Sequence, residues 1–192
     1  MVALFVEPLQ DVILGGDRIY LRPPKRGEYL DWSRLREASR SFLEPWEPVW
    51  PADALSRMSY RRRLRRILAD WREDVGYAFH LVRRSDERLL GGIALSNVRR
   101  GVAQTAGIGY WIGAEFADQG YMTEALDALI SFAFSDLGLH RLEAACLPRN
   151  EASYRLLMKV GFHQEGMARS YLRINGAWED HLLFGLLRED RD

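Results

Sequence analysis

The chain has 192 residues and zero formal net charge, with 47% hydrophobic and 28% charged residues, as expected for one globular domain with a substantial core. Balanced charge argues against a general attraction to nucleic acid or an anionic membrane. The single cysteine, Cys146, excludes an internal disulfide, and the amino terminus has no basic segment and is too short for a signal peptide or a membrane span. We therefore expect one cytoplasmic domain, residues 1–192, with residues 1–17 as an extension.

The first half of the chain predicts strands on either side of two helices. Residues 18–22 alternate in polarity and end at two prolines, which is typical of a strand. Three prolines within 42–51 argue against regular structure there. Asp53 is a good helix cap, and the apolar residues up to Trp71 recur at helical spacing. The elements expected are a strand pair in the first dozen residues, strand 18–22, helix 27–39, helix 53–71, and strands 77–83 and 89–97.

The second half predicts a mixed sheet with crossover helices. A strand over 104–112 precedes a helix that starts after Gly120, runs to about Leu137 and ends at Gly138. A buried strand at 140–147 precedes a helix over 150–160, and Asn175–Gly176 is a strong signal for a terminal hairpin. This order predicts an α/β fold, a mixed sheet with helices on its faces.

The turn at Gly120 predicts an anion site. A strand that passes through a glycine turn into a helix leaves unpaired N–H groups at the helix start, at the positive end of the helix dipole. A second helix start, residues 148–153, follows the strand over 140–147. If this strand lies beside 104–112, both helix starts emerge at the same end of the sheet, where ligands of open α/β sheets bind.

Five ordered motifs carry a resemblance to a known family. Residues 109–113, 119–125, 140–144, 150–153 and 159–162 resemble the GNAT acetyltransferases. Residues 43–48, 164–166 and 176–181 are similar to the RimJ/RimL branch, the ribosomal-protein N-terminal acetyltransferases and their relatives. The resemblance covers nearly the whole chain from about residue 18. It implies a central, mostly antiparallel mixed sheet with splayed central strands, helices on both faces, and use of acetyl-CoA.

The resemblance also implies roles for individual residues. The pantetheine arm bonds to the backbone near Trp111 and Ile112 and contacts Asn150. Ser153 donates a proton to the departing thiolate. The pyrophosphate accepts hydrogen bonds from the start of the helix, namely the amides of Gln119, Gly120, Tyr121 and Met122 and the hydroxyl of Thr123. The chain departs from the family at Ala117, usually Gln or Arg, and at Met122, usually Gly or Ala. Amide donors survive both changes, but a side-chain contact from residue 117 to phosphate is put in question.

The expected reaction is direct attack of an amine on the thioester, and the favoured acceptor is a protein N-terminus. An α-amine has a pKa of about 8, against about 10.4 for lysine, so roughly a tenth of it is free at neutral pH. No strong base is evident. The candidates are Glu44, Glu47 and Glu115, with Glu44 carried forward as a catalytic residue and Trp46, Glu47 and His181 as substrate-binding residues.

Alternatives remain open for several features. Asn150 and Ser153 also fit a helix cap, and residues 42–51 could be a substrate lip or a packed connection. The arginines from Arg57 to Arg66 favour a solvated helix face, with a contact to ribosomal RNA or an acidic target as the alternative. Cys146 is expected in the core, and no metal site is expected. The alternative functions are acetylation of a small amine, such as an amino acid, polyamine or drug, and a silent CoA-binding or RNA-binding module. The protein is expected to be a monomer or homodimer.

Overall fold

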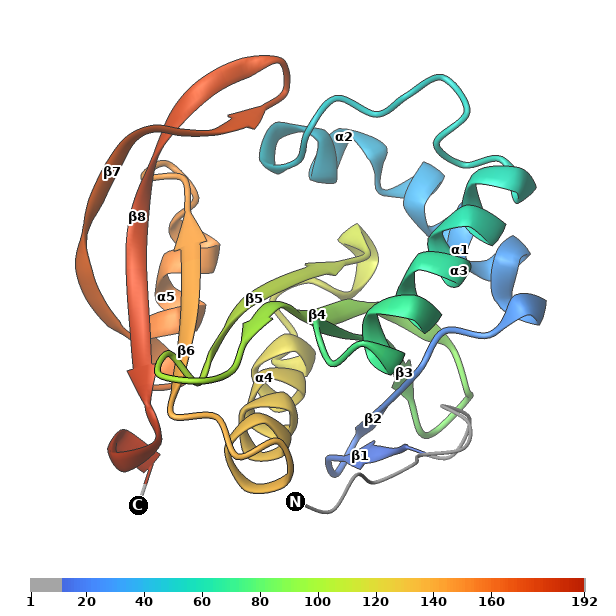
Figure 1. Cartoon of the computed structure of the whole chain (residues 1–192). Helices are drawn as coiled ribbons and strands as arrows, with labels where there is room; N and C mark the ends of the chain where they lie inside the picture. Colours follow the sequence, from blue (N-terminus) through green and yellow to red (C-terminus); the bar gives the residue numbers. More distant parts are fainter. Residues whose placement is uncertain (1–11, 192) are drawn as a thin grey trace.

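The computed structural model describes residues 12–191, whose strands form one sheet of eight in the order β1-β2-β3-β4-β5-β6-β8-β7 (Figure 1). The strands are β1 (Leu14–Gly15), β2 (Ile19–Arg22), β3 (Gly76–Arg83), β4 (Leu89–Arg99), β5 (Thr105–Ile112), β6 (Arg141–Cys146), β7 (His163–Ile174) and β8 (Ala177–Leu187). The mixed α/β fold expected from the sequence is confirmed.

Five α-helices and several short turns of helix join these strands. They are α1 (Tyr29–Ala38), α2 (Arg40–Leu43), α3 (Arg57–Arg72), α4 (Tyr121–Ser131) and α5 (Glu151–Lys159). Single turns of 3-10 helix occur at Arg26–Glu28, Glu44–Trp46, Ala114–Phe116 and Arg188–Arg191, and a π-helical turn, Phe132–Asp136, extends α4. Figure 1 shows α1 and α2 above β4 and β5, α4 below these strands, and α5 beside β6.

The sheet is antiparallel except between β5 and β6, which run parallel. These two strands pair only at residues 105–107 with 141–143, although β5 continues to Ile112. Beyond Gly107 the strands separate, and the β6-facing edge of residues 108–112 has no strand partner among residues 12–191. The splayed central strands expected from the sequence are therefore present, and we call the opening the β5–β6 gap.

The strand registers assign residues to the two faces of the sheet. Side chains alternate between faces along a strand, so Tyr110 lies on the same face as Ala106, which pairs with Leu142 of β6. That face carries the main core, including Leu129 of α4 and Leu157 of α5. Trp111 projects from the opposite face, where it packs against a cluster of α1 and α3 residues, Trp32, Tyr60 and Leu64. Tyr110 and Trp111 thus mark the two sides of the β5–β6 gap.

The start of α3 corrects one sequence expectation. Asp53 is not the cap. The helix begins at Arg57, and the hydroxyl of Ser56 accepts the N–H of Ser59 at 3.1 Å. Asp53 lies in the preceding turn and pairs with Arg62 at 2.8 Å. Serine and aspartate are about equally good caps, so residue type alone does not choose between positions three residues apart.

The proline-rich segment 42–51 is also more regular than expected. The end of α2 and a 3-10 turn, Glu44–Trp46, extend into it. Pro45 stands at the start of that turn, where a missing N–H removes no helical hydrogen bond. The strand pair expected in the first dozen residues falls largely on 1–11, outside the described residues, while Leu14–Gly15 pairs with β2.

The terminal hairpin confirms its turn signal and contacts the proline-rich segment. Asn175 and Gly176 both have positive φ, 44° and 87°, as a type I′ turn requires. The N–H of Asn175 donates to the carbonyl of Glu47 at 2.9 Å. Val49 lies 3.6 Å from the position a Cβ of Gly176 would occupy. The hairpin tip is therefore fastened to the loop after α2, near which it lies in Figure 1.

Candidate active site

The start of α4 presents a row of free backbone N–H groups. Gly120 is its N-cap residue, with φ of 80°, and no side chain caps the helix. Within residues 12–191, the N–H groups of residues 119–123 meet no protein acceptor. The N–H of Glu124 is the next along the chain and reaches the carbonyl of Gly120 at 3.3 Å. Free N–H groups at a helix start are suited to an anion, so this turn has the donors that an anion site requires.

Arg18, at the start of the described N-terminal region, holds this turn in place. Its guanidinium donates to the carbonyl of Gln119 at 3.0 Å, bonds the carboxylate of Glu124 at 3.1 Å and lies 4.8 Å from the ring centre of Tyr121. The carboxylate of Glu124 also accepts the backbone N–H groups of Arg18 and Ile19, at 2.7 and 3.2 Å. The guanidinium of Arg18, the residue directly before β2, therefore lies beside a turn that carries alanine at residue 117.

Tyr110 and Ser153 meet at the β5–β6 gap. Their hydroxyl groups hydrogen-bond at 2.6 Å, joining β5 to the first turn of α5. Burial raises the pKa of Tyr110 to about 12, so this phenol keeps its proton at neutral pH. Asn150 does cap α5, because its Oδ1 accepts the N–H of Ser153 at 3.1 Å. The cap orients Ser153 toward the gap, so the structural and functional interpretations of this pair are compatible.

The opposite face of the gap carries a stack of alternating arginine and tryptophan side chains. The guanidinium of Arg36 lies 4.3 Å from the ring centre of Trp50 and 4.8 Å from that of Trp111, and Arg40 lies 4.8 Å from Trp50. We call Arg40, Trp50, Arg36 and Trp111 the arginine–tryptophan stack. Contacts of this kind stabilise by about 0.5–2 kcal/mol each, depending on burial. The stack connects α1 and the proline-rich loop to β5.

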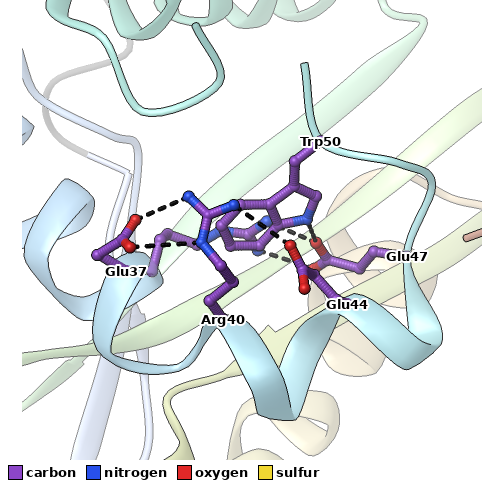
Figure 2. Close-up of polar contacts among 6 residues, drawn as sticks. Glu37, Arg40, Glu44, Glu47 and Trp50 are labelled. Atoms are coloured by element: carbon purple, nitrogen blue, oxygen red, sulfur yellow. Dashed lines mark hydrogen bonds and ion pairs between the residues drawn. The ribbon is translucent and has the colours of Figure 1, made fainter. Parts of the chain in front are cut away.

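Glu47 fastens the stack through three hydrogen bonds. Its carboxylate accepts the indole N–H of Trp50 at 2.7 Å (Figure 2) and two bonds from Arg36, at 2.8 and 2.5 Å. The side chains of Arg36 and Glu47 are only 13% and 22% exposed. Both oxygens of this carboxylate therefore have hydrogen-bond partners, and Glu47 links α1 to the loop that carries Trp50.

Glu44 lies on the outer side of the same segment. Figure 2 shows Arg40 between the carboxylates of Glu37 and Glu44, which it reaches at 2.8 and 3.2 Å. The carboxylate of Glu44 is 41% exposed. Glu115 is likewise exposed and pairs with Arg88 at 2.9 Å. Each carboxylate considered as a base therefore has a basic partner in the described structure.

His181 and Trp46 occupy different environments. His181 is buried on β8, where its Nδ1 lies 3.0 Å from the carbonyl of Glu179 and its ring makes an edge contact with Tyr171. The next residue, Leu182, pairs with Cys146 on the core face. His181 therefore projects from the same face of the sheet as Trp111. Trp46 is half-buried in the 3-10 turn after α2. Cys146 is buried, and burial raises the pKa of its thiol.

Sequence reasoning missed Arg18, Arg36, Arg40 and Tyr110. Arg36 and Arg40 stand four residues apart next to a segment with two tryptophans, a spacing that places both side chains on one side of a helix. That pattern is the signal that could have identified the stack. Tyr110 lies in the motif formed by residues 109–113. Its contact with Ser153 spans 43 residues and depends on the sheet pairing, so the motif alone does not predict it.

Neither a membrane span nor a metal cluster is found in the described part of the chain. Within residues 12–191, no helix has both the length and the apolar character needed to cross a bilayer. Among the same residues, no group of three or more His, Cys, Asp or Glu side chains is placed to hold a metal ion.

Comparisons with known proteins agree on one family. Residues 18–163 match the family described as acetyltransferase (GNAT) domain. The probable N-acetyltransferase YjcK of Bacillus subtilis is 37% identical over 93% of this chain and 98% of its own length. The [ribosomal protein uS5]-alanine N-acetyltransferase of Escherichia coli is 35% identical over 79% of this chain and 78% of its own.

A solved structure extends the likeness to three dimensions. Mycobacterium smegmatis RimJ, in complex with a CoA disulfide, has a TM-score of 0.86 and 32% identity to this chain. The match covers 93% of this chain and 85% of that structure. The resemblance stated from the sequence motifs is confirmed by both kinds of comparison.

Proposed function

Because the chain belongs to the GNAT family of acetyltransferases, we propose that it transfers the acetyl group of acetyl-CoA to the N-terminal α-amine of a protein. N-acetyltransferase activity is what the family and its relatives share. We propose the identity of the cosubstrate, the identity of the acceptor and the roles of individual residues. The relatives named for ribosomal proteins favour a ribosomal protein as acceptor and the cytoplasm as location.

One observation carries the proposal: free N–H groups at residues 119–123 beside an open strand edge at 108–112. An anion bound to the N–H groups of residues 119–123 would lie next to an extended group that bonds along the open strand edge, residues 108–112. Acetyl-CoA has both parts, a pyrophosphate and an amide-bearing pantetheine arm, and when bound it supplies the thioester that the amine attacks. Gln119, Gly120, Tyr121 and Met122 provide amides for the pyrophosphate, and Thr123 adds its hydroxyl.

The remaining cofactor contacts follow from the same arrangement. The backbone of Trp111 and Ile112 bonds the pantetheine arm along the open edge, and the side chain of Asn150 contacts it from α5. The hydroxyl of Ser153 holds the proton for the departing thiolate. Tyr110, which keeps its own proton at neutral pH, orients that hydroxyl. Arg18, whose charge is paired with Glu124, places a guanidinium beside the turn, where residue 117 is alanine.

The acceptor approaches from the face that carries the arginine–tryptophan stack. Trp46 and His181 contribute to this face, and Glu47 acts by holding Arg36 and Trp50 in place rather than as a base. Since every candidate carboxylate already has a basic partner, an acceptor that is partly deprotonated at neutral pH is favoured. An α-amine is easier to deprotonate than lysine by about 2.4 pKa units, or roughly 3 kcal/mol.

An acetylation panel tests the proposal. The enzyme is incubated with acetyl-CoA and peptides with free N-termini, the same peptides with blocked N-termini and an internal lysine, free amino acids and polyamines, and release of CoA is measured. Turnover restricted to free peptide N-termini is expected. Faster turnover of amino acids or polyamines would indicate a small-molecule enzyme, and cofactor binding without any turnover would indicate a silent module.

A contact between the Arg57–Arg66 helix and the ribosome is a secondary proposal. Arg57, Arg61 and Arg65 line one side of a groove of about 770 Å³ between α3 and the 3-10 turn Arg26–Glu28. None of the described residues that line the groove is acidic, which suits an anionic surface. Binding of the protein to ribosomes should then weaken steeply with salt, and salt-independent binding would contradict the contact.

A further inference from the structure

The structure divides the six arginines between Arg57 and Arg66 into three groups. Arg62 and Arg66 pair with acidic residues of the turn before α3 and of α3 itself. Arg57, Arg61 and Arg65 line the large groove. Arg63 alone lines a different cavity, on the other side of the helix. The sequence shows one basic run, but only Arg63 belongs to the surroundings of the arginine–tryptophan stack.

This cavity has a volume of about 270 Å³ and lies between α1, α3 and the proline-rich loop. Trp32 and Trp50 form its aromatic walls, and Arg36, Glu47 and Arg63 are its charged side chains. Because Trp50 and Arg36 are members of the stack, the cavity adjoins Trp111 and the face of the β5–β6 gap that the acceptor uses. The cavity is thus placed to receive the part of an acceptor that follows the reacting amine.

The charges in the cavity do not balance. Glu47 is the single carboxylate among its lining residues, and Arg36 and Trp50 occupy it with three hydrogen bonds. Arg63 has no carboxylate within ion-pair distance among residues 12–191, although its neighbours 62 and 66 do. The cavity therefore contains two guanidinium groups and one anion, and Arg63 has its hydrogen-bond donors free.

The surroundings of Arg63 support the same conclusion. Residue 63 is accessible to solvent, yet protein surrounds its guanidinium closely enough that lost hydration, and next the charge of Arg36, lower its pKa. An accessible group that is enclosed by protein lies in a concave site. An added anion would relieve the repulsion between the two guanidinium groups and could bond Arg63 through two parallel N–H donors.

We propose that Arg63 binds a carboxylate of the acceptor and selects acceptors that carry one near the reacting amine. This inference rests on the proposed function, since it assigns the acceptor side of the same site. The carboxylate belongs to an aspartate or glutamate side chain close to the N-terminus of a peptide, or to the α-carboxylate of a small amine. Both sources present the same group to Arg63, and they are separated by experiment.

The test compares matched acceptors with matched variants. Peptides that differ only by Glu or Gln at positions 2, 3 and 4 are assayed with the wild type, Arg63→Gln and Arg63→Glu. Arg62→Gln removes the same charge one residue away and serves as the control. A free amino acid and its amide form the second pair, which separates a small acceptor from a peptide.

The wild type should acetylate the best glutamate peptide roughly tenfold to a hundredfold more efficiently than its glutamine partner. Arg63→Gln should remove that preference by raising KM for the acidic peptide, with the neutral peptide and acetyl-CoA affinity unchanged. Arg63→Glu should reverse the charge preference, so that lysine-containing peptides are acetylated more efficiently than acidic ones. Arg62→Gln should keep the preference. A preference confined to the free amino acid would assign the site to a small acceptor.

Three results would overturn the inference. In the first, Arg63→Gln acetylates acidic and neutral peptides with equally reduced efficiency. In the second, Arg63→Gln keeps the wild-type preference for the acidic peptide. In the third, Arg62→Gln loses that preference to the same extent as Arg63→Gln. Calorimetry of peptide binding to the CoA-loaded protein keeps the two proposals distinct. Arg63-dependent binding of acidic peptides without turnover would contradict the proposed function alone, while turnover with no charge preference would contradict the Arg63 site alone.

Discussion

The two sides of the β5–β6 gap are made from different parts of the chain. On the side proposed for the cofactor, the turn at Gly120 offers five backbone N–H groups from consecutive residues. On the side proposed for the acceptor, the arginine–tryptophan stack uses four side chains from α1, α2, the proline-rich segment and β5. A backbone site depends on conformation, so we expect the proposed cofactor side to tolerate Ala117 and Met122. A side-chain site depends on the identity of each member, so a single substitution alters it.

Tyr110 and Ser153 act on the proposed cofactor side through their side chains, and loss of the Tyr110 hydroxyl should have the largest effect. Tyr110→Phe removes the hydroxyl that orients Ser153, and we expect kcat to fall about a hundredfold while acetyl-CoA affinity is retained. Since burial raises the Tyr110 pKa to about 12, the phenol is protonated below that pH. The kcat of the wild type should therefore show no loss from this group between pH 6 and 10.

Combination with Ser153→Ala checks that the two hydroxyls act as one unit. The double variant should be little slower than either single variant, because both changes remove the same proton donor. Additive losses in kcat would show that Tyr110 and Ser153 act separately. A fall in cofactor affinity with kcat unchanged would show that Tyr110 contributes to cofactor binding and not to the chemical step.

Gly120→Ala should have the next largest effect and tests whether the cofactor side is a backbone site. An alanine at a φ of 80° costs about 1–2 kcal/mol, and its Cβ would lie 3.2 Å from the guanidinium of Arg18. We expect acetyl-CoA to bind roughly tenfold more weakly by calorimetry. Gly138, beyond the π-helical end of the same helix, also has positive φ, 67°, with open space around it.

Gly138→Ala is therefore the matched control. It should destabilise the fold by a similar amount in urea unfolding and leave cofactor affinity unchanged. If both variants weakened binding equally, the effect would be loss of helix stability, and the free N–H groups of residues 119–123 would have no special role.

Glu47→Gln should have the smallest effect and tests the acceptor side. The amide keeps the shape of the side chain but weakens its bonds to Arg36, so the stack should loosen. We expect the KM for an acceptor peptide to rise about threefold to tenfold, as for a weakened charge-assisted hydrogen bond, with acetyl-CoA affinity unchanged. Glu44→Gln changes an exposed neighbour and should have little effect. Equal rises in both variants would show that the loop responds to charge alone.

The same contrast explains what the sequence could predict. The turn at Gly120 lies within one short segment, and glycine, strand and helix signals locate it without knowledge of the fold. Asn150 and Ser153 are likewise three residues apart. The stack joins Arg36 to Trp111 across 75 positions, and the contact exists only after the sheet and α1 have packed. Glu47 bonds Arg36 only when α1 packs against the proline-rich segment. The position of Glu47 in that segment therefore predicts substrate binding and does not reveal its bonds to Arg36.

The helix boundaries also show that a short segment predicts some features, whereas others depend on the surrounding structure. The apolar spacing of α3 predicted its core face, including Leu64 and Ile67. Its start was placed at Asp53 because a capping residue stands there too, and the choice of Ser56 depends on how the loop leaves the helix.

The hydrogen bond between Asn175 and Glu47 has a further consequence for selection. It joins the hairpin tip to the proline-rich segment on the face proposed for the acceptor, so these two segments form one continuous edge of that face. An extended chain end can lie along such an edge, whereas a lysine in the middle of a folded surface brings its whole protein against it. If the acceptor enters past this edge, shape favours chain ends over internal amines in addition to any difference in amine basicity.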